Sequence, residues 1–109
     1  MCRALKVLCV AEDAEALAEL KGAAVSAEWE LAPGAATEEE ALAQLDAERP
    51  HVLVVFGAFE GFVVEALERY PAIRVVADRE LPGAAVAGAS LGDVRSAVLG
   101  APLRGPVTR

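Results

Sequence analysis

The sequence is short of basic side chains, and this shortage limits the partners that the protein can have. Lysine and arginine together number 10 against 17 aspartates and glutamates, which gives a formal net charge of −7 at pH 7. The basic residues are scattered and form no stripe. Nucleic acids and anionic membranes bind clustered positive charge, so we expect no nucleic acid and no membrane as a partner.

Side chains that could carry out catalysis are also scarce. His51 is the one histidine, and Cys2 and Cys9 are the two cysteines. His51 precedes a predicted strand, at the end opposite the usual site of an α/β sheet, which favours a solvated loop residue over a catalytic base. Cys9 lies within a predicted strand, and Glu15 stands where a Cys-x5-Arg phosphatase has its arginine. The spacing of the three residues fits no zinc site. We expect no enzymatic activity, no metal and no other cofactor.

Long apolar runs are absent as well, and none approaches the length that crosses a membrane. The first run is stopped by Glu12 and Asp13 with no cleavage site after it, so a signal peptide is not expected. Cys2 and Cys9 are too far apart on an extended segment to form a disulfide. Reduced cysteines indicate a cytoplasmic protein.

The clearest structural signal in the sequence is the stretch 51–57. It is apolar, rich in β-branched residues, entered after Pro50 and ended by Gly57, which is typical of a strand buried on both faces of a parallel sheet. Residues 5–10 and 73–77 predict further inner strands. Residues 25–31 alternate apolar and acidic side chains, which predicts an edge strand. Residues 84–89 could form a weak fifth strand.

Helices are predicted between these strands. Apolar side chains recur at helical spacing over 14–24, over 37–48 and over 62–70. Thr37 followed by Glu40, and Ser90 followed by Asp93, have the spacing of N-terminal capping boxes. Alternating strands and helices predict an α/β three-layer sandwich with a mainly parallel five-stranded sheet. We expect one domain over residues 1–100 and a flexible tail over 101–109.

The segment 78–83 is too short for the helix that normally joins parallel strands. Either a loop replaces the fourth helix, or the fifth strand turns back antiparallel, and we favour the loop. Such a loop would leave the sheet uncovered near Val75, Leu81 and Val86. Since soluble proteins rarely expose large apolar patches, this predicts a homodimer through that side.

Segments 6–13, 50–56 and 91–98, together with Gly61, resemble the receiver domains of bacterial two-component response regulators. The resemblance extends over nearly all of residues 5–100 and implies a flavodoxin-like fold with strand order 2-1-3-4-5. It also implies a signalling role in a two-component system.

The residues that this family uses for phosphorylation do not carry over. Its reaction uses an acidic pair that binds magnesium, a phosphoacceptor aspartate after the third strand, a hydroxyl after the fourth strand and a lysine after the fifth. The corresponding positions are Ala11 and Glu12 (or Glu12 and Asp13), Phe56, Ala77, and Ala89 or Ser90. A phenyl ring cannot accept a phosphoryl group, and one or two carboxylates alone make a poor magnesium site. The chain therefore resembles a degenerate member of the family, a pseudo-receiver.

Ligands of open parallel sheets bind beyond the carboxyl ends of the strands. In that region Phe59 could be an exposed contact residue or could fold back over the crevice. The candidate contact residues are Gly57, Phe59, Glu60, Leu81 and Val86. Two functions remain open: a non-phosphorylatable signalling module that binds another protein or itself, and a small ligand-binding domain that uses the crevice.

Overall fold

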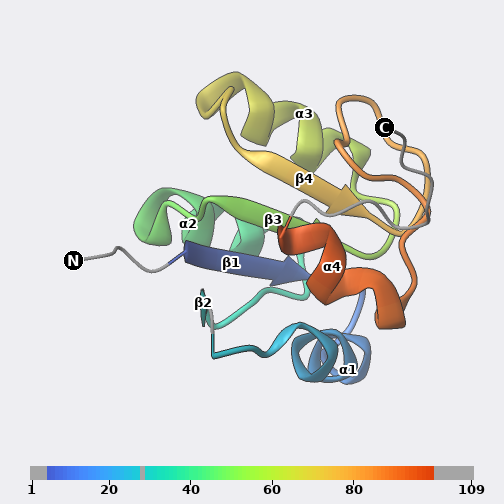
Figure 1. Cartoon of the computed structure of the whole chain (residues 1–109). Helices are drawn as coiled ribbons and strands as arrows, with labels where there is room; N and C mark the ends of the chain where they lie inside the picture. The colour runs from blue at the N-terminus through green and yellow to red at the C-terminus, as the bar shows by residue number, and fades with distance from the viewer. Residues whose placement is uncertain (1–4, 28, 100–109) are drawn as a thin grey trace.

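The computed structural model describes residues 5–27 and 29–99, in which four strands form one parallel sheet (Figure 1). The strands are β1 (Leu5–Val10), β2 (Trp29–Leu31), β3 (Val52–Val55) and β4 (Arg74–Ala77). Their order is β2-β1-β3-β4, and every pairing is parallel. The run around residues 51–57 therefore does supply an inner strand, as predicted.

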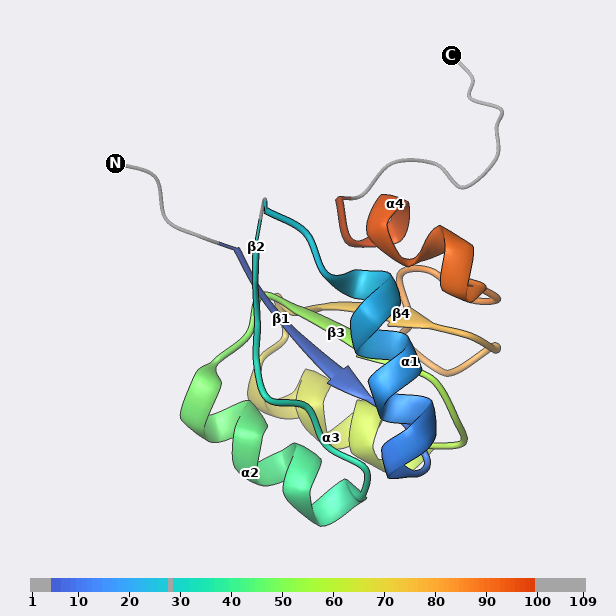
Figure 2. The ribbon, with the colours of Figure 1, turned by 90° about the horizontal axis from the view of Figure 1, so that it is seen from below.

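Helices cover both faces of the sheet, which confirms the three-layer α/β architecture (Figure 2). They are α1 (Ala14–Ala24), α2 (Glu38–Glu48), α3 (Glu60–Arg69) and α4 (Val94–Leu99), with a short 3-10 helix, η1 (Leu91–Asp93), directly before α4. Helices α2 and α3 pack on one face, and α1 and α4 pack on the other. None of the helices in the described ranges is long and apolar enough to cross a membrane.

The strand side chains alternate between two hydrophobic cores. Leu8 and Leu53 point into the core beneath α2 and α3, whereas Val7 and Val54 point into the core beneath α1 and α4. All four side chains are fully buried, with 0% exposure. Burial on both faces is what the continuous apolar runs indicate, because neither face of an inner parallel strand reaches water.

Three of the helical segments begin at polar caps, as their sequences predict. Thr37 Oγ1 accepts the N–H of Glu40 at 3.1 Å at the start of α2. Asp13 Oδ1 accepts the N–H of Ala16 at 2.8 Å at the start of α1. The Asp93 carboxylate accepts the N–H of Ser90 at 3.1 Å at the start of η1. Because strands are parallel, all these caps lie at the carboxyl edge of the sheet.

Two predicted strands are shorter than expected. The edge strand covers only Trp29–Leu31, because α1 continues to Ala24 and the chain must turn before it can pair with β1. The expected fifth strand over 84–89 is reduced to one parallel bridge between Val86 and Val76. Glycines with positive φ at Gly83 (+84°) and Gly88 (+78°) flank this segment and limit its extended stretch. The described residues thus form four strands rather than five.

The connection after β4 is a loop, and this loop covers the sheet itself. No helix occurs between Ala77 and Leu91, so the fourth helix is replaced as predicted, and the bridge at Val86 is parallel. Leu81 is only 6% exposed and packs in the core beneath α3, and Val75 is 1% exposed. The expected open patch near Val75 and Leu81 is therefore wrong, because the side chain of Leu81 fills it.

Cys9 is buried, in keeping with the unreactive thiol that its place in a strand suggests. Cys2 and the predicted tail over 101–109 lie outside the described residues.

Candidate functional site

The carboxyl edge of the sheet holds a shallow hollow of about 200 Å³ where the sequence places the candidate crevice. Its lining comes from the ends of β1, β3 and β4 and from α1. The lining residues are Glu12, Asp13, Ala16, Phe56, Gly57, Asp78 and Arg79. Ligand pockets for small molecules usually measure about 300–1,000 Å³, so this hollow is small for a ligand-binding domain.

Phe56 occupies the position at which the receiver resemblance places the phosphoacceptor. It follows β3 directly, and its N–H donates to the carbonyl oxygen of Val10 at 2.8 Å, which continues the sheet by one hydrogen bond. Its half-buried ring packs against the core beneath α1 and α4. The ring is therefore held by the core and offers no oxygen to a phosphoryl donor.

The other positions carried over from the family are structural. Ala11, Ala77 and Ala89 are buried at 0%, 0% and 2% exposure. Ser90 lies at the start of η1, where its hydroxyl and its N–H both bond to the Asp93 carboxylate. Asp13 caps α1. The three alanines carry no polar side-chain group, and the Ser90 hydroxyl and the Asp13 carboxylate are engaged at the starts of helices.

Glu12 and Asp78 are the two carboxylates that face the loop after β3. The N–H of Gly57 donates to Asp78 Oδ1 at 3.2 Å, and the N–H of Ala58 donates to Glu12 Oε2 at 3.2 Å. Gly57 has φ +136°, a conformation that favours glycine. Both carboxylates are thus engaged by the backbone of this loop.

Arg79 brings a positive charge to the same hollow. Its Nε lies 3.1 Å from Asp78 Oδ1 and its Nη2 lies 3.2 Å from Asp78 Oδ2. The hydrogen bond and charge of Asp78, with weaker contributions from Glu12 and Glu60, raise the pKa of Arg79 above its usual value. Arg79 was not among the residues expected from the sequence; the signal for it is a base directly after the acid that ends the β4 segment.

Within residues 5–27 and 29–99, no group of three or more histidine, cysteine, aspartate or glutamate side chains is arranged to hold a metal ion. Of the carboxylates near the hollow, Asp13 is engaged in capping and Asp78 in an ion pair.

The candidate contact residues differ in accessibility. Phe59 is half-buried and packs against the core beneath α2 and α3. Of the two alternatives expected from the sequence, its ring therefore folds back and is not an exposed contact. Gly57 and Leu81 are buried, Val86 is half-buried, and Glu60 is exposed in the first turn of α3.

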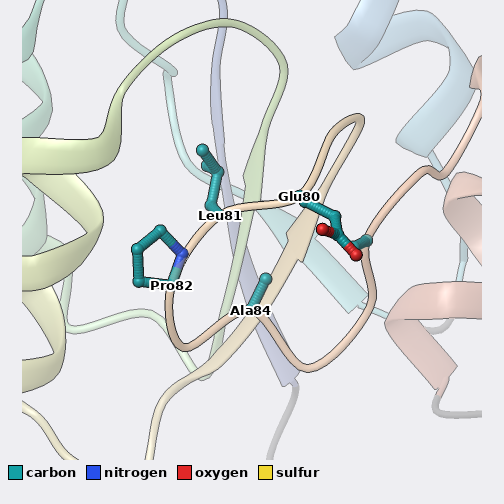
Figure 3. A pocket seen from close by; sticks show the side chains of 5 residues that line it. Glu80, Leu81, Pro82 and Ala84 are labelled. Carbon is teal, nitrogen blue, oxygen red and sulfur yellow. The ribbon is translucent and has the colours of Figure 1, made fainter.

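A wider hollow of about 450 Å³ lies beside the loop that replaces the fourth helix (Figure 3). Leu81, Pro82, Ala84 and Ala87 line it together with Glu80. The view shows Pro82 on the side of α3 and Glu80 on the opposite side of the loop (Figure 3). Four of its five lining residues are apolar, and Glu80 contributes one carboxylate.

The carboxyl edge carries more negative charge than the rest of the molecule. Residues 11–15, 38–40, 56–60 and 78–79 contribute eight acidic side chains and one basic one, Arg79. The acids include the first turns of α1, α2 and α3, whose N-termini all face this edge because the strands are parallel. In contrast, the exposed large apolar side chains of the described residues, Val25, Val64 and Leu91, belong to three different elements.

No protein-family model and no curated protein matches this sequence. A similar solved structure is the response regulator domain of CheB from Thermotoga maritima, with a TM-score of 0.66 and 16% sequence identity. The match covers 90% of this chain and 92% of that domain. At this identity the comparison shows the fold, and the chain therefore has the α/β fold of a response regulator receiver domain.

Proposed function

We propose that this protein is a receiver-fold signalling module that acts by binding another protein and does not accept a phosphoryl group. The proposal is supported above all by Phe56, which stands at the end of β3 with its ring packed in the core. Transfer to this position would need an oxygen nucleophile, and neither Phe56 nor the adjacent Gly57 supplies one.

The state of the remaining carboxylates supports the same proposal. Phosphoryl transfer depends on a divalent cation held by carboxylates, which neutralises charge on the moving group. Here Glu12 and Asp78 accept backbone N–H groups, and Arg79 pairs with Asp78. A cation at Asp78 would compete with Gly57 and Arg79 for both carboxylate oxygens.

The acidic carboxyl edge is the surface that we propose for docking. Four segments of this edge, residues 11–15, 38–40, 56–60 and 78–79, carry eight acids against one base, whereas the large apolar side chains exposed on the described residues are isolated. Complementary charge steers association and selects partners. A twofold homodimer through this edge would place it against itself and bring like charges together, so the fitting partner for this edge is a protein that presents clustered lysines and arginines.

Phosphorylation is tested by intact mass after incubation with acetyl phosphate and magnesium. A phosphorylatable receiver domain serves as the positive control in the same buffer. We expect no mass gain for this protein. A stable added phosphoryl group would contradict the first half of the proposal.

Docking is tested with charge reversals on the two ends of the same helices. The variant Glu38→Lys/Glu39→Lys/Glu60→Lys changes the acidic edge, and the matched variant Glu48→Lys/Glu65→Lys/Glu68→Lys changes the opposite ends of α2 and α3. Proteins captured from a lysate of the source organism should be lost with the first variant, kept with the second and released by salt. Equal capture by both variants would rule out the acidic edge.

A further inference from the structure

Two consecutive N–H groups in the loop after β3 are bound by carboxylates rather than by backbone oxygens. Gly57 donates to Asp78 at 3.2 Å and Ala58 donates to Glu12 at 3.2 Å. The acceptors come from different segments, one after β1 and one after β4. The loop therefore ties together the ends of three strands through side chains alone at these two positions.

The chain on either side of these two residues is held by regular structure. Phe56 donates to Val10 in the manner of a strand residue, at 2.8 Å. Phe59 accepts the N–H of Val63 at 3.0 Å in the first turn of α3. Within the piece between the sheet and the helix, the N–H of Phe59 donates to the carbonyl oxygen of Gly57 at 3.0 Å, so residues 57–59 form one turn. Side chains join this turn to the neighbouring loops through Glu12 and Asp78, so loosening these contacts frees the turn without breaking β3 and at the cost of only the first hydrogen bond of α3.

Asp78 is itself held in place. The guanidinium of Arg79 bonds both of its oxygens, at 3.1 and 3.2 Å, and the Asp78 side chain is 23% exposed. A charged acceptor forms stronger hydrogen bonds than a neutral one. Replacing either carboxylate by its amide keeps the shape of the side chain and weakens its hydrogen bond to the loop. The contribution of each carboxylate can therefore be tested by a single substitution.

The loop also positions an aromatic ring. Phe59 packs against the core beneath α2 and α3. A Cβ at Gly57 would lie 2.5 Å from Glu12 Cγ and 2.9 Å from Phe59 Cε2, so the loop, the carboxylate and the ring are in close contact. We therefore expect the ring of Phe59 to move with the loop.

We propose that residues 57–59 form a latched lid on the carboxyl edge, held closed by Glu12 and Asp78 and opening as one unit. In the closed lid both carboxylates are occupied and Phe59 is packed. In the open lid both carboxylates are released to the acidic edge and the ring of Phe59 is exposed. The lid is a feature of the fold and does not depend on whether a partner docks.

The test is backbone hydrogen exchange of the full chain, followed residue by residue by NMR at fixed pH and temperature. The variants are Glu12→Gln and Asp78→Asn. A lid that opens as a unit predicts that each single variant speeds exchange at both Gly57 and Ala58, by roughly tenfold, which corresponds to about 1.4 kcal/mol. The resonances of the Phe59 ring should shift in both variants.

The matched control is Asp13→Ala, which removes the carboxylate that caps α1 at the same edge and does not touch the loop. It should speed exchange at Ala16 and leave Gly57 and Ala58 unchanged. Amides at the centre of β3 report global unfolding. Each variant weakens the closed native state, so these amides should accelerate too, but in every variant they should stay slower than the amides of Gly57 and Ala58. The lid is overturned if each variant speeds only its own partner amide, if neither amide changes, or if the amides of Gly57 and Ala58 exchange no faster than the β3 amides in the parent protein, which would mean that they open only by global unfolding.

Discussion

The carboxylate of Asp46 on α2 accepts a hydrogen bond from the hydroxyl of Tyr70, at the end of α3, at 2.9 Å. Arg69 pairs with the same carboxylate and, at 2.9 Å, with Glu65. These contacts join the two helices that cover one face of the sheet. Because they involve a titratable carboxylate, their contribution to the free energy of unfolding depends on pH.

Asp46→Asn should lower the free energy of unfolding at neutral pH and flatten the acid limb of the stability curve. The Tyr70 hydrogen bond, followed by Arg69, lowers the pKa of Asp46 below its usual value. A lowered pKa contributes stability above the unfolded pKa of about 3.9, and that stability is lost as pH falls through the folded pKa. Urea midpoints between pH 7 and pH 2 measure this effect.

Tyr70→Phe is the control for the Asp46 prediction, because it removes the main hydrogen bond and keeps the ring. The double variant should lose less stability than the sum of the two single variants, since both act on one contact. Strictly additive losses would show that the pair does not contribute as a unit.

Cys9 should resist alkylation in the folded protein. Burial raises the pKa of its thiol to about 12, and the thiolate is the reactive form. In a Cys2→Ser background, which leaves Cys9 as the single thiol, iodoacetamide at pH 8 should label the native protein far more slowly than the urea-unfolded protein. Equal rates would mean that Cys9 is accessible.

Alkaline pH should destabilise the protein partly through Cys9. A raised folded pKa contributes stability below the unfolded pKa of about 8.5, and this contribution is lost as pH rises toward about 12. Cys9→Ala should therefore show a shallower loss of stability than the parent between pH 9 and pH 11. Parallel curves would contradict this assignment.

Gly57→Ala should destabilise the fold by about 2 kcal/mol or more. The residue has φ +136°, and an added Cβ would meet Glu12 Cγ at 2.5 Å. Gly22→Ala is the opposite case, because Gly22 is inside α1 with nothing within 4 Å of an added Cβ. This second change should stabilise by up to about 1 kcal/mol. Urea unfolding of both variants measures the difference.

Trp29→Phe should cost about 1–3 kcal/mol. The indole Nε1–H donates to the carbonyl oxygen of Ala24 at 2.8 Å, and the side chain is 6% exposed. Phenylalanine keeps the ring in the core and leaves that buried oxygen without its donor. Trp29 is also the one tryptophan, so its emission should be blue-shifted in the native state and move to the red on unfolding. A red native emission would contradict its burial.

Local patterns in the sequence determined most of the elements. The apolar runs around Val7 and Val54, the caps at Thr37 and Ser90, and the loop in place of a helix after Asp78 could each be predicted, because each depends on neighbouring residues. The fifth strand could not. Whether residues 84–89 extend along β4 depends on pairing with a distant segment, and only one bridge at Val86 forms.

The site divides along the same line. The sequence alone determined that Phe56, and not a carboxylate, follows the central strand, because the end of an apolar run is a local feature. Only the tertiary structure decided that Glu12 and Asp78 meet on the N–H groups of residues 57 and 58 and that Arg79 joins them. These groups come from three loops: Glu12 is 46 positions from Ala58, and Asp78 is 21 positions from Gly57. The parallel sheet brings the three loops together at one edge. Hydrogen bonds between such segments depend on distances of a few ångströms that strand order and register set, and no local pattern carries that information.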